Sequence, residues 1–487
     1  MKKLTIISLS LGLLASACTK NLTSLNNDPK SAVTVPSKTL FTKGEKDIAD
    51  IMSTTSVSSA PFRVLAQEWT ENTYVYEAQY NFAAYQANSG FWTVLFGGAT
   101  TSIGIMNNLQ QAKLTFPTDV ADPVAMRNDL IITDILEVYA YYLLTATYGD
   151  IPYTQSENKT IPFPAYDDAK TVYTDLLLRL DSCIAGINTS GAAMGKADLI
   201  YSGSPTKWKT FAATLKLKIA MLSANVDAAT AGKKASEAIA TGVFASNADN
   251  ALFSYDASAV GNSNPIWQAL VNSGRHDFLP TNLLVNTMLN LNDPRVPIYF
   301  TKDPNGNYTG GIPGGGNGYG VNSDFGPTLQ TAAYPGDVLD YVESEFLQAE
   351  AVERGFAGVT GTAAFHYGNA VTASIMFWGG TAAQAATYLA QPAVNYATPG
   401  QTWQQKIGWQ KWIANYNRNW EAWTEIRRLG YPNLDVVNPP TAAQGKLPLR
   451  LTYPANEVTS NSTNWSAAAK KLPGGTDAVS AKLWWMP

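Results

Sequence analysis

Apolar residues recur every three or four positions through most of this chain, and this spacing restricts the fold more than any other feature. Over 129–148 they fall on one face of a helix that ends at Gly149. The same spacing predicts helices over 169–187, 205–225, 229–243, 337–354, 363–378 and 403–429. Short connections rich in glycine favour helix pairs, so we expect an all-α fold with a tetratricopeptide-like stack. The strict 34-residue signature of that repeat is absent.

Turn-forming residues interrupt this spacing between 251 and 336. Pro, Gly, Asn and Asp are dense there, and one short helix is expected, at about 280–291. A long irregular stretch inside a helical protein is usually functional or disordered. Its scattered aromatic residues favour a functional loop region.

Five aromatic residues recur at steps of three and four in the predicted helix 403–429. They are Trp409, Trp412, Tyr416, Trp420 and Trp423. A tryptophan stripe at helical spacing belongs to the core more often than to a ligand platform. We therefore assign it to the core.

The N-terminus has the pattern of a secretory signal. Two lysines precede an uncharged apolar run over 4–14, and small residues lead to Cys18. A cysteine at that place resembles a bacterial lipobox, which implies cleavage before Cys18 and its acylation. We expect a signal peptide over 1–17 and a lipidated tether over 18–36. No later apolar run looks long enough to cross a membrane.

Composition restricts the ligand class. The formal net charge is −4 and only 15% of residues are charged, which argues against nucleic acid or anionic lipid as ligand. A weakly charged chain rich in Trp and Tyr fits an uncharged polar ligand, such as a sugar or, less well, a peptide. With Cys18 acylated, Cys183 has no disulfide partner and is expected to be a small buried residue.

Several segments, in order along the chain, resemble the SusD/RagB family of nutrient-binding outer-membrane lipoproteins, and its second SusD-like branch in particular. They are Asn27-Asp28-Pro29, Tyr148-Gly149-Asp150-Ile151-Pro152-Tyr153, Glu345-Phe346-Leu347-Gln348-Ala349-Glu350-Ala351, Asn419-Trp420-Glu421-Ala422-Trp423 continuing to Pro432, and Pro448-Leu449-Arg450-Leu451-Thr452-Tyr453-Pro454. Each motif alone is weak, but the ordered set is specific and covers nearly the whole chain.

The resemblance implies a single all-α domain over 37–487, built on about four tetratricopeptide-like helix pairs with the long loops packed on one side. It also implies a function. It implies capture of glycan or peptide at the cell surface and delivery to a SusC-like TonB-dependent transporter, over which the protein sits as a lid. No cofactor is implied. Thr19-Lys20-Asn21-Leu22 follows the cysteine, without the acidic residues that some surface lipoproteins carry there. The outward orientation therefore rests on the family alone.

The sequence holds few residues of the types that common catalytic sites require. The chain holds two histidines, His276 and His366, so His-rich zinc sites and Ser-His-Asp hydrolysis are disfavoured. Asp303, Asn305 and Asn307 alternate as at the start of a calcium-binding loop. Gly314 stands at the twelfth position of such a loop, which favours an Asx turn and no metal.

The rival hypothesis is a surface glycoside hydrolase that uses a carboxylate pair. Glu343 and Glu350 lie seven residues apart on one predicted helix. Because buried charges require partners, we expect these carboxylates instead to pair with an arginine such as Arg427 or Arg428. A third possibility is a structural lid with negligible affinity for any ligand.

Two regions have the aromatic and polar residues that sugar binding requires. Aromatic rings cover the apolar faces of sugars, and amides and carboxylates bind their hydroxyls, in concave sites on loops. The first region contributes Trp69, Tyr74, Tyr76 and Tyr80. The second contributes Asn264, Trp267, Arg275, Asp277 and Tyr319. These nine residues are the predicted ligand-binding candidates.

Overall fold

The computed structural model of the chain describes residues 35–81, 87–98, 103–156, 158, 160–434 and 446–487. The predicted signal peptide, Cys18 and nearly all of the predicted tether lie outside the described residues.

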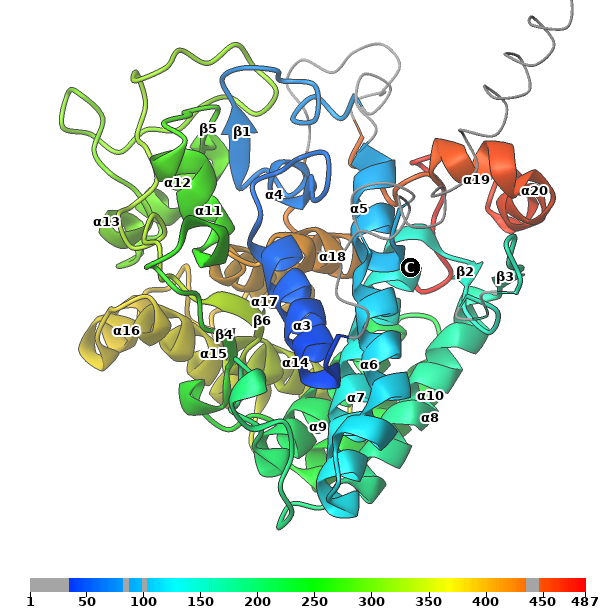
Figure 1. Cartoon of the computed structure of the whole chain (residues 1–487). Coiled ribbons are helices and arrows are strands. Elements are labelled where there is room, and N and C mark those ends of the chain that lie inside the picture. Colours follow the sequence, from blue (N-terminus) through cyan, green and yellow to red (C-terminus); the bar gives the residue numbers. More distant parts are fainter. Residues whose placement is uncertain (1–34, 82–86, 99–102, 157, 159, 435–445) are drawn as a thin grey trace, which may run out of the picture.

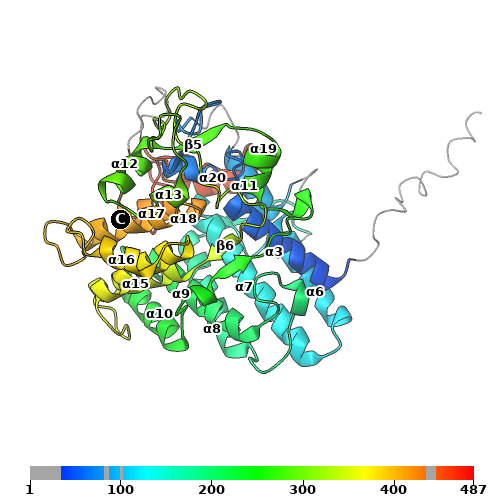
Figure 2. The same ribbon diagram turned by 90° about the vertical axis from the view of Figure 1, so that its left-hand side faces the viewer.

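Paired helices form the body of the protein, in the centre and lower part of Figure 1 and again in Figure 2. The pairs are α3 (Ser37–Ser53) with α6 (Ile105–Asp119), α7 (Pro123–Tyr148) with α8 (Ala169–Gly186), α9 (Pro205–Leu222) with α10 (Ala228–Thr241), and α14 (Tyr341–Glu353) with α15 (Ala363–Phe377). The prediction of an all-α, tetratricopeptide-like fold is confirmed.

Local sequence signals set the ends of these helices. Asp122 accepts a hydrogen bond from the Val124 amide at the start of α7, and Gly149 ends the helix with a φ of 93°. Ser204 caps α9 in the same way, ahead of a proline at the first helical position.

Helix α7 corrects one expectation about membranes. Among the described residues, α7 is the one helix long and apolar enough to cross a bilayer. The expectation from sequence was that no apolar run after the signal peptide has that length. Its most apolar window is 83% buried inside the protein, because α7 packs against α6, α8 and α9. Helix α7 is therefore a core helix.

The loop region begins and ends at the same two-stranded ribbon. Strand β4 (Ala251–Phe253) pairs antiparallel with β6 (Gly336–Leu339), which is also why α14 begins later than the predicted residue 337. Between them lie η3 (Val260–Asn262), α11 (Pro265–Trp267), η4 (Gln268–Asn272), β5 (Phe278–Pro280), α12 (Asn282–Asn290) and α13 (Val296–Tyr299). Helix α12 is the one predicted from sequence, and much of the region lies together at the upper left of Figure 1.

Two more short ribbons complete the strands. After α4 (Phe62–Leu65), β1 (Trp69–Glu71) pairs antiparallel with β5, and β2 (Ile151–Pro152) pairs with β3 (Tyr166–Asp167). The remaining elements are η1 (Gly195–Ala197), η2 (Asn247–Asp249), α5 (Ala87–Phe96), α16 (Ala382–Leu389), α19 (Ala455–Ser460) and α20 (Ser462–Lys471).

The predicted helix over 403–429 is wrong in one respect, because it is two helices. Helix α17 (Trp403–Ala414) and helix α18 (Asn419–Leu429) are separated by a turn at 415–418. The Arg63 guanidinium donates hydrogen bonds of 3.2 and 3.3 Å to the carbonyls of Tyr416 and Asn417. These carbonyls are thus satisfied by a distant residue instead of by the helix.

The aromatic stripe of 403–429 lies in the core, as predicted. Trp412, Tyr416, Trp420 and Trp423 are at most 1% exposed, and Trp409 is partly buried. The main hydrophobic cluster runs from Phe41 to Met486, and a smaller one joins α14, α15, α16 and α17. Cys183 is a buried free cysteine, as expected, and burial raises the pKa of its thiol.

Candidate functional site

The β1/β5 ribbon brings the two predicted binding regions together. Glu71 stands opposite Phe278 in its register, and the Asn72 amide donates a 2.9 Å hydrogen bond to the Asp277 carbonyl just beyond. The chain that leaves β1 therefore lies beside the chain that enters β5, although about 200 residues separate them in sequence.

A hollow of about 490 Å³ lies at this junction. Three predicted residues line it, namely Tyr74, Arg275 and Asp277. Its other lining residues are Thr55, Ser56, Val57, Ser58, Glu71, Thr73, Glu77, Ala269, Leu270 and Phe278. The volume is in the range of small-molecule sites, and the mixture of aromatic, hydroxyl and carboxyl groups suits a polar ligand with apolar faces.

Tyr74 is the most accessible aromatic ring of this hollow. It is 59% exposed, and its backbone is left-handed, with a φ of 59°. That conformation is rare for a non-glycine residue and is frequently found at functional positions. Arg275 forms an ion pair with Asp277 at the rim. The site thus combines an exposed ring with charged hydrogen-bonding groups.

A second, smaller hollow of about 100 Å³ shares Phe278 with the first and is also lined by Asn72, His276, Leu279 and the loop at 318–324. Tyr319 lines it and is 68% exposed, and its ring lies 4.9 Å from the His276 ring, centre to centre. Tyr319 therefore lies in a hollow that adjoins the larger one, and it is not part of the wall of the larger hollow.

Three predicted residues are buried, and none of them lines either hollow. Trp69 is 1% exposed and packs 4.0 Å from the Phe325 ring. Tyr80 is 3% exposed and donates a hydrogen bond to the Leu65 carbonyl. Asn264 is fully buried and caps α11, where its side chain accepts from the Ile266 amide. The assignment of these three residues to direct ligand contact is corrected, because their side chains are buried outside the walls of both hollows.

The two remaining candidates lie outside the wall of the hollow. Tyr76 is 40% exposed, and Trp267 is partly buried in α11. Neither lines the hollow. Their part in binding stays a prediction.

Sequence reasoning missed two carboxyl groups in the wall. Glu71 is 2% exposed, and burial, with the nearby charges of Glu77 and Asp277, raises its pKa to about 8 against the hydrogen bond from Ala78. Burial also raises the pKa of Glu77, which is 1% exposed. The sequence signal that could have identified these two carboxyl groups is the presence of acidic residues among the aromatic residues of 68–80.

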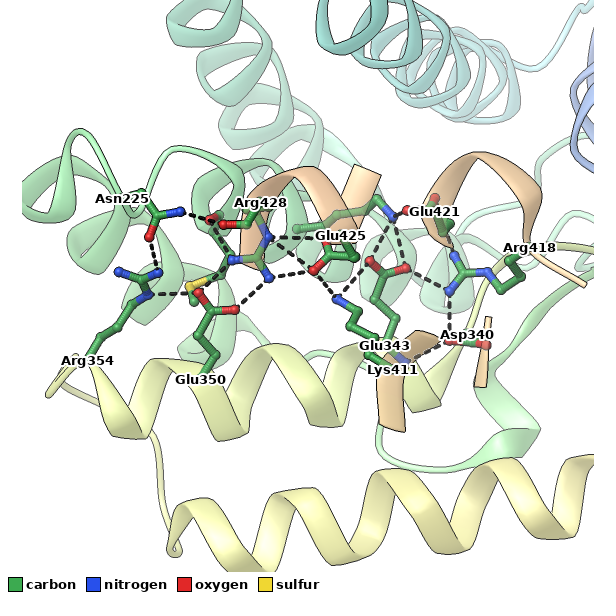
Figure 3. Close-up of polar contacts among 12 residues, drawn as sticks. Asn225, Asp340, Glu343, Glu350, Arg354, Lys411, Arg418, Glu421, Glu425 and Arg428 are labelled. Carbon is green, nitrogen blue, oxygen red and sulfur yellow. Dashed lines mark hydrogen bonds and ion pairs between the residues drawn. The ribbon is translucent and has the colours of Figure 1, made fainter. Parts of the chain in front are cut away.

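The carboxylate pair of the hydrolase hypothesis lies in a buried ion network (Figure 3). Glu343 is 1% exposed and accepts from Lys218 at 2.8 Å and Arg418 at 2.7 Å. Despite burial, Lys218, Arg418 and Lys411 hold its pKa well below the ordinary value. A carboxylate held in its ionised form cannot serve as the general acid of a glycosidase.

The partner of Glu350 was predicted correctly. Glu350 is fully buried and binds Arg428 through both oxygens, at 2.5 and 2.6 Å. Arg427 instead donates to the Ala146 and Leu449 carbonyls. Glu343 and Glu350 are therefore charges with structural partners, and neither lines the hollow.

The structure gives Asp303 the role expected from sequence. Its carboxylate accepts from the Asn305 and Asn307 amides at 2.8 and 2.9 Å, as in an Asx turn. Within the described ranges, no group of three or more His, Cys, Asp or Glu residues is arranged to hold a metal ion.

Comparison with known proteins agrees with this architecture. Residues 27–454 match the profile of a SusD-like family described as starch-binding and associating with the outer membrane. Among curated proteins there is no match.

Solved structures with the same fold are numerous. A chitin-binding protein is 26% identical, with a TM-score of 0.78 over 92% of this chain and 99% of its own. A SusD homologue from Bacteroides uniformis is 26% identical, with a TM-score of 0.76 and the same coverage. A chitin-binding SusD homologue from Flavobacterium johnsoniae, 23% identical over 91% of this chain and 98% of its own, shares the fold with a TM-score of 0.74. The chain therefore belongs to the SusD-like family of proteins described as starch-binding and associating with the outer membrane.

Proposed function

We propose that this protein captures an oligosaccharide in the hollow beside the β1/β5 ribbon. The observation that carries the proposal is the exposed Tyr74 ring in a hollow that is also lined by carboxyl and hydroxyl groups. An aromatic face covers the apolar face of a sugar ring, while the polar wall binds its hydroxyls. The family description, which is starch-binding, and the 26% identical chitin-binding protein support a glycan in preference to a peptide.

We further propose that the protein is held on the outer surface of the outer membrane by acyl chains on Cys18. Each buried methylene contributes about 0.8 kcal/mol, so several chains would keep the protein on the membrane. From there it would pass its ligand to a SusC-like TonB-dependent transporter. The family's association with the outer membrane supports this location.

Titration calorimetry with maltose-, cellulose- and chitin-derived oligosaccharides, and with a mixed peptide pool, tests the binding site. We expect one glycan class to bind, and Tyr74→Ala to weaken it about tenfold, which corresponds to about 1.4 kcal/mol. Phe365→Ala is the matched control, because that ring is 57% exposed on α15, away from the hollow. Equal losses in both variants would refute the site, and tighter binding of peptides would refute the glycan.

Chromatography of the same mixtures tests for hydrolysis. Intact glycan after prolonged incubation is expected. Products that disappear in Glu343→Gln or Glu350→Gln would establish the hydrolase instead.

For the transporter, purification of the tagged protein from its native outer membranes in mild detergent should recover a TonB-dependent barrel, identified by mass spectrometry. Cys18→Ala, with the signal peptide retained, tests the lipid anchor separately.

A further inference from the structure

Carboxyl groups outnumber cations around the hollow beside β1/β5. Glu71, Glu77 and Asp277 line it, whereas Arg275 is its one lining cation. Arg275 is already engaged, because its guanidinium forms an ion pair with Asp277. Among the described residues, Glu71 and Glu77 therefore have no counter-charge.

Glu77 is the clearest case. Its side chain lines the hollow and is 1% exposed, and its Oε1 atom has no hydrogen-bond partner among the described residues. Glu71, beside it, accepts one hydrogen bond of 3.1 Å from the Ala78 amide through Oε2. Across the described part of the chain, no lysine, arginine or histidine forms an ion pair with Glu71 or Glu77, and no cation contributes to the pKa of either.

Two buried carboxyl groups without a cation are energetically unfavourable unless a further group supplies positive charge or hydrogen-bond donors. An ionised carboxylate in a buried setting requires a cation or several donors, and without them the group stays protonated. The raised pKa values of Glu71 and Glu77 follow from that cost. The ion network around Glu343 shows the contrast, because there each buried carboxylate has a cation.

We propose that the hollow binds a sugar residue bearing a free amino group, whose ammonium is held by Glu77 and Glu71 beneath the Tyr74 ring. This inference rests on the proposed glycan-binding function and names the ligand class. An ammonium supplies both the charge and the three donors that the two carboxyl groups lack. The Tyr74 ring, which is 59% exposed over the same hollow, adds a face that attracts cations.

Three tetrasaccharides that differ only at carbon 2 test the proposal. The β-1,4-linked glucosamine, N-acetylglucosamine and glucose tetramers carry an amine, an acetamide and a hydroxyl at the same position. Calorimetry with the full-length protein at pH 6.5 and low salt is expected to give a Kd at least tenfold lower for the amine than for the other two. Added salt should reduce that preference, because it depends on charge.

The variants identify the group responsible. Glu77→Gln keeps the shape of the side chain and should reduce the preference for the amine to threefold or less, because the amine tetramer loses more affinity than the hydroxyl tetramer. Glu353→Gln, which removes an exposed acid elsewhere, controls for net charge and should leave the preference intact.

The outcomes separate this inference from the proposed function. Equal binding of all three tetramers, or tighter binding of the acetamide, leaves glycan binding standing and overturns the inference. An amine preference that survives in Glu77→Gln also overturns it. Failure of all three tetramers to bind would overturn the inference and count against the proposed function together.

Discussion

Removing the Arg428 guanidinium should destabilise the protein strongly without affecting ligand binding. Arg428 donates to both oxygens of Glu350 at 2.5 and 2.6 Å, and to Glu425 at 2.6 Å. All three side chains lie in the buried network of Figure 3. In Arg428→Met, Glu350 keeps Arg354 at 2.7 Å and Glu425 keeps Lys411 at 3.0 Å, so each carboxylate retains one cation.

Breaking a buried ion pair by removing one partner costs about 3–5 kcal/mol. Because each carboxylate keeps a second cation, we expect the lower end, about 3 kcal/mol, in the free energy of unfolding. Adding Glu350→Gln to Arg428→Met should recover about 1–2 kcal/mol, because a buried carboxylate that has lost one of its two cations is then removed. Lys43→Met is the control. Its pair with Asp47 has a lysine side chain that is 57% exposed, so the loss should stay below about 0.5 kcal/mol.

Urea unfolding followed by far-ultraviolet circular dichroism and by tryptophan fluorescence measures these differences, provided that the two transitions coincide. A loss below about 1 kcal/mol in Arg428→Met would refute the view that the network is structural. So would a loss of glycan affinity in the folded variant, since neither Arg428 nor Glu350 lines the hollow.

Three further expectations follow from the same structure. Trp69→Ala removes a ring that is 1% exposed and packs against Phe325, and it should lower the free energy of unfolding in urea by about 3–5 kcal/mol. Tyr319→Ala removes an exposed ring and should lower it by less than about 0.5 kcal/mol. Similar losses in the two variants would contradict the burial of Trp69. Glu71 has a folded pKa of about 8 against an ordinary 4.5, so its contribution to stability is complete below pH 4.5 and is lost as pH rises through about 8. Between pH 5 and 8, the free energy of unfolding of the wild type should accordingly fall by about 1.4 kcal/mol per pH unit relative to that of Glu71→Gln. Parallel curves of unfolding free energy against pH for the two proteins would refute the raised pKa. Cys18→Ala should move the processed protein from the membrane to the soluble fraction after cell lysis and ultracentrifugation, and its persistence in the membrane pellet would argue against acylation.

Periodicity was enough to predict the paired helices because it records which face of each helix is buried. The expected helices over 205–225 and 363–378 end within a few residues of α9 and α15, where Ser204 and Thr362 cap their first turns. Caps and apolar spacing are local signals, so they can be read without knowing the partner helix.

The break between α17 and α18 could not be predicted in the same way. Apolar spacing continues through 415–418, and no proline or glycine marks the turn. The turn forms because Arg63 takes the Tyr416 and Asn417 carbonyls, and because Tyr299 stacks on Tyr416 at 4.3 Å. Both contacts come from residues more than 100 positions away.

By itself, the sequence determined the helical class, the place of the long loop region and the buried tryptophan stripe, because each follows from spacing along one segment. Only the tertiary structure decided which candidates share a site. The pairing of β1 with β5 brings Tyr74, Arg275 and Asp277 to one hollow and places Glu71 and Glu77 in its wall, whereas Trp69 and Tyr80 are buried. Strand pairing across about 200 residues depends on how the intervening helices pack, and no local pattern records that arrangement.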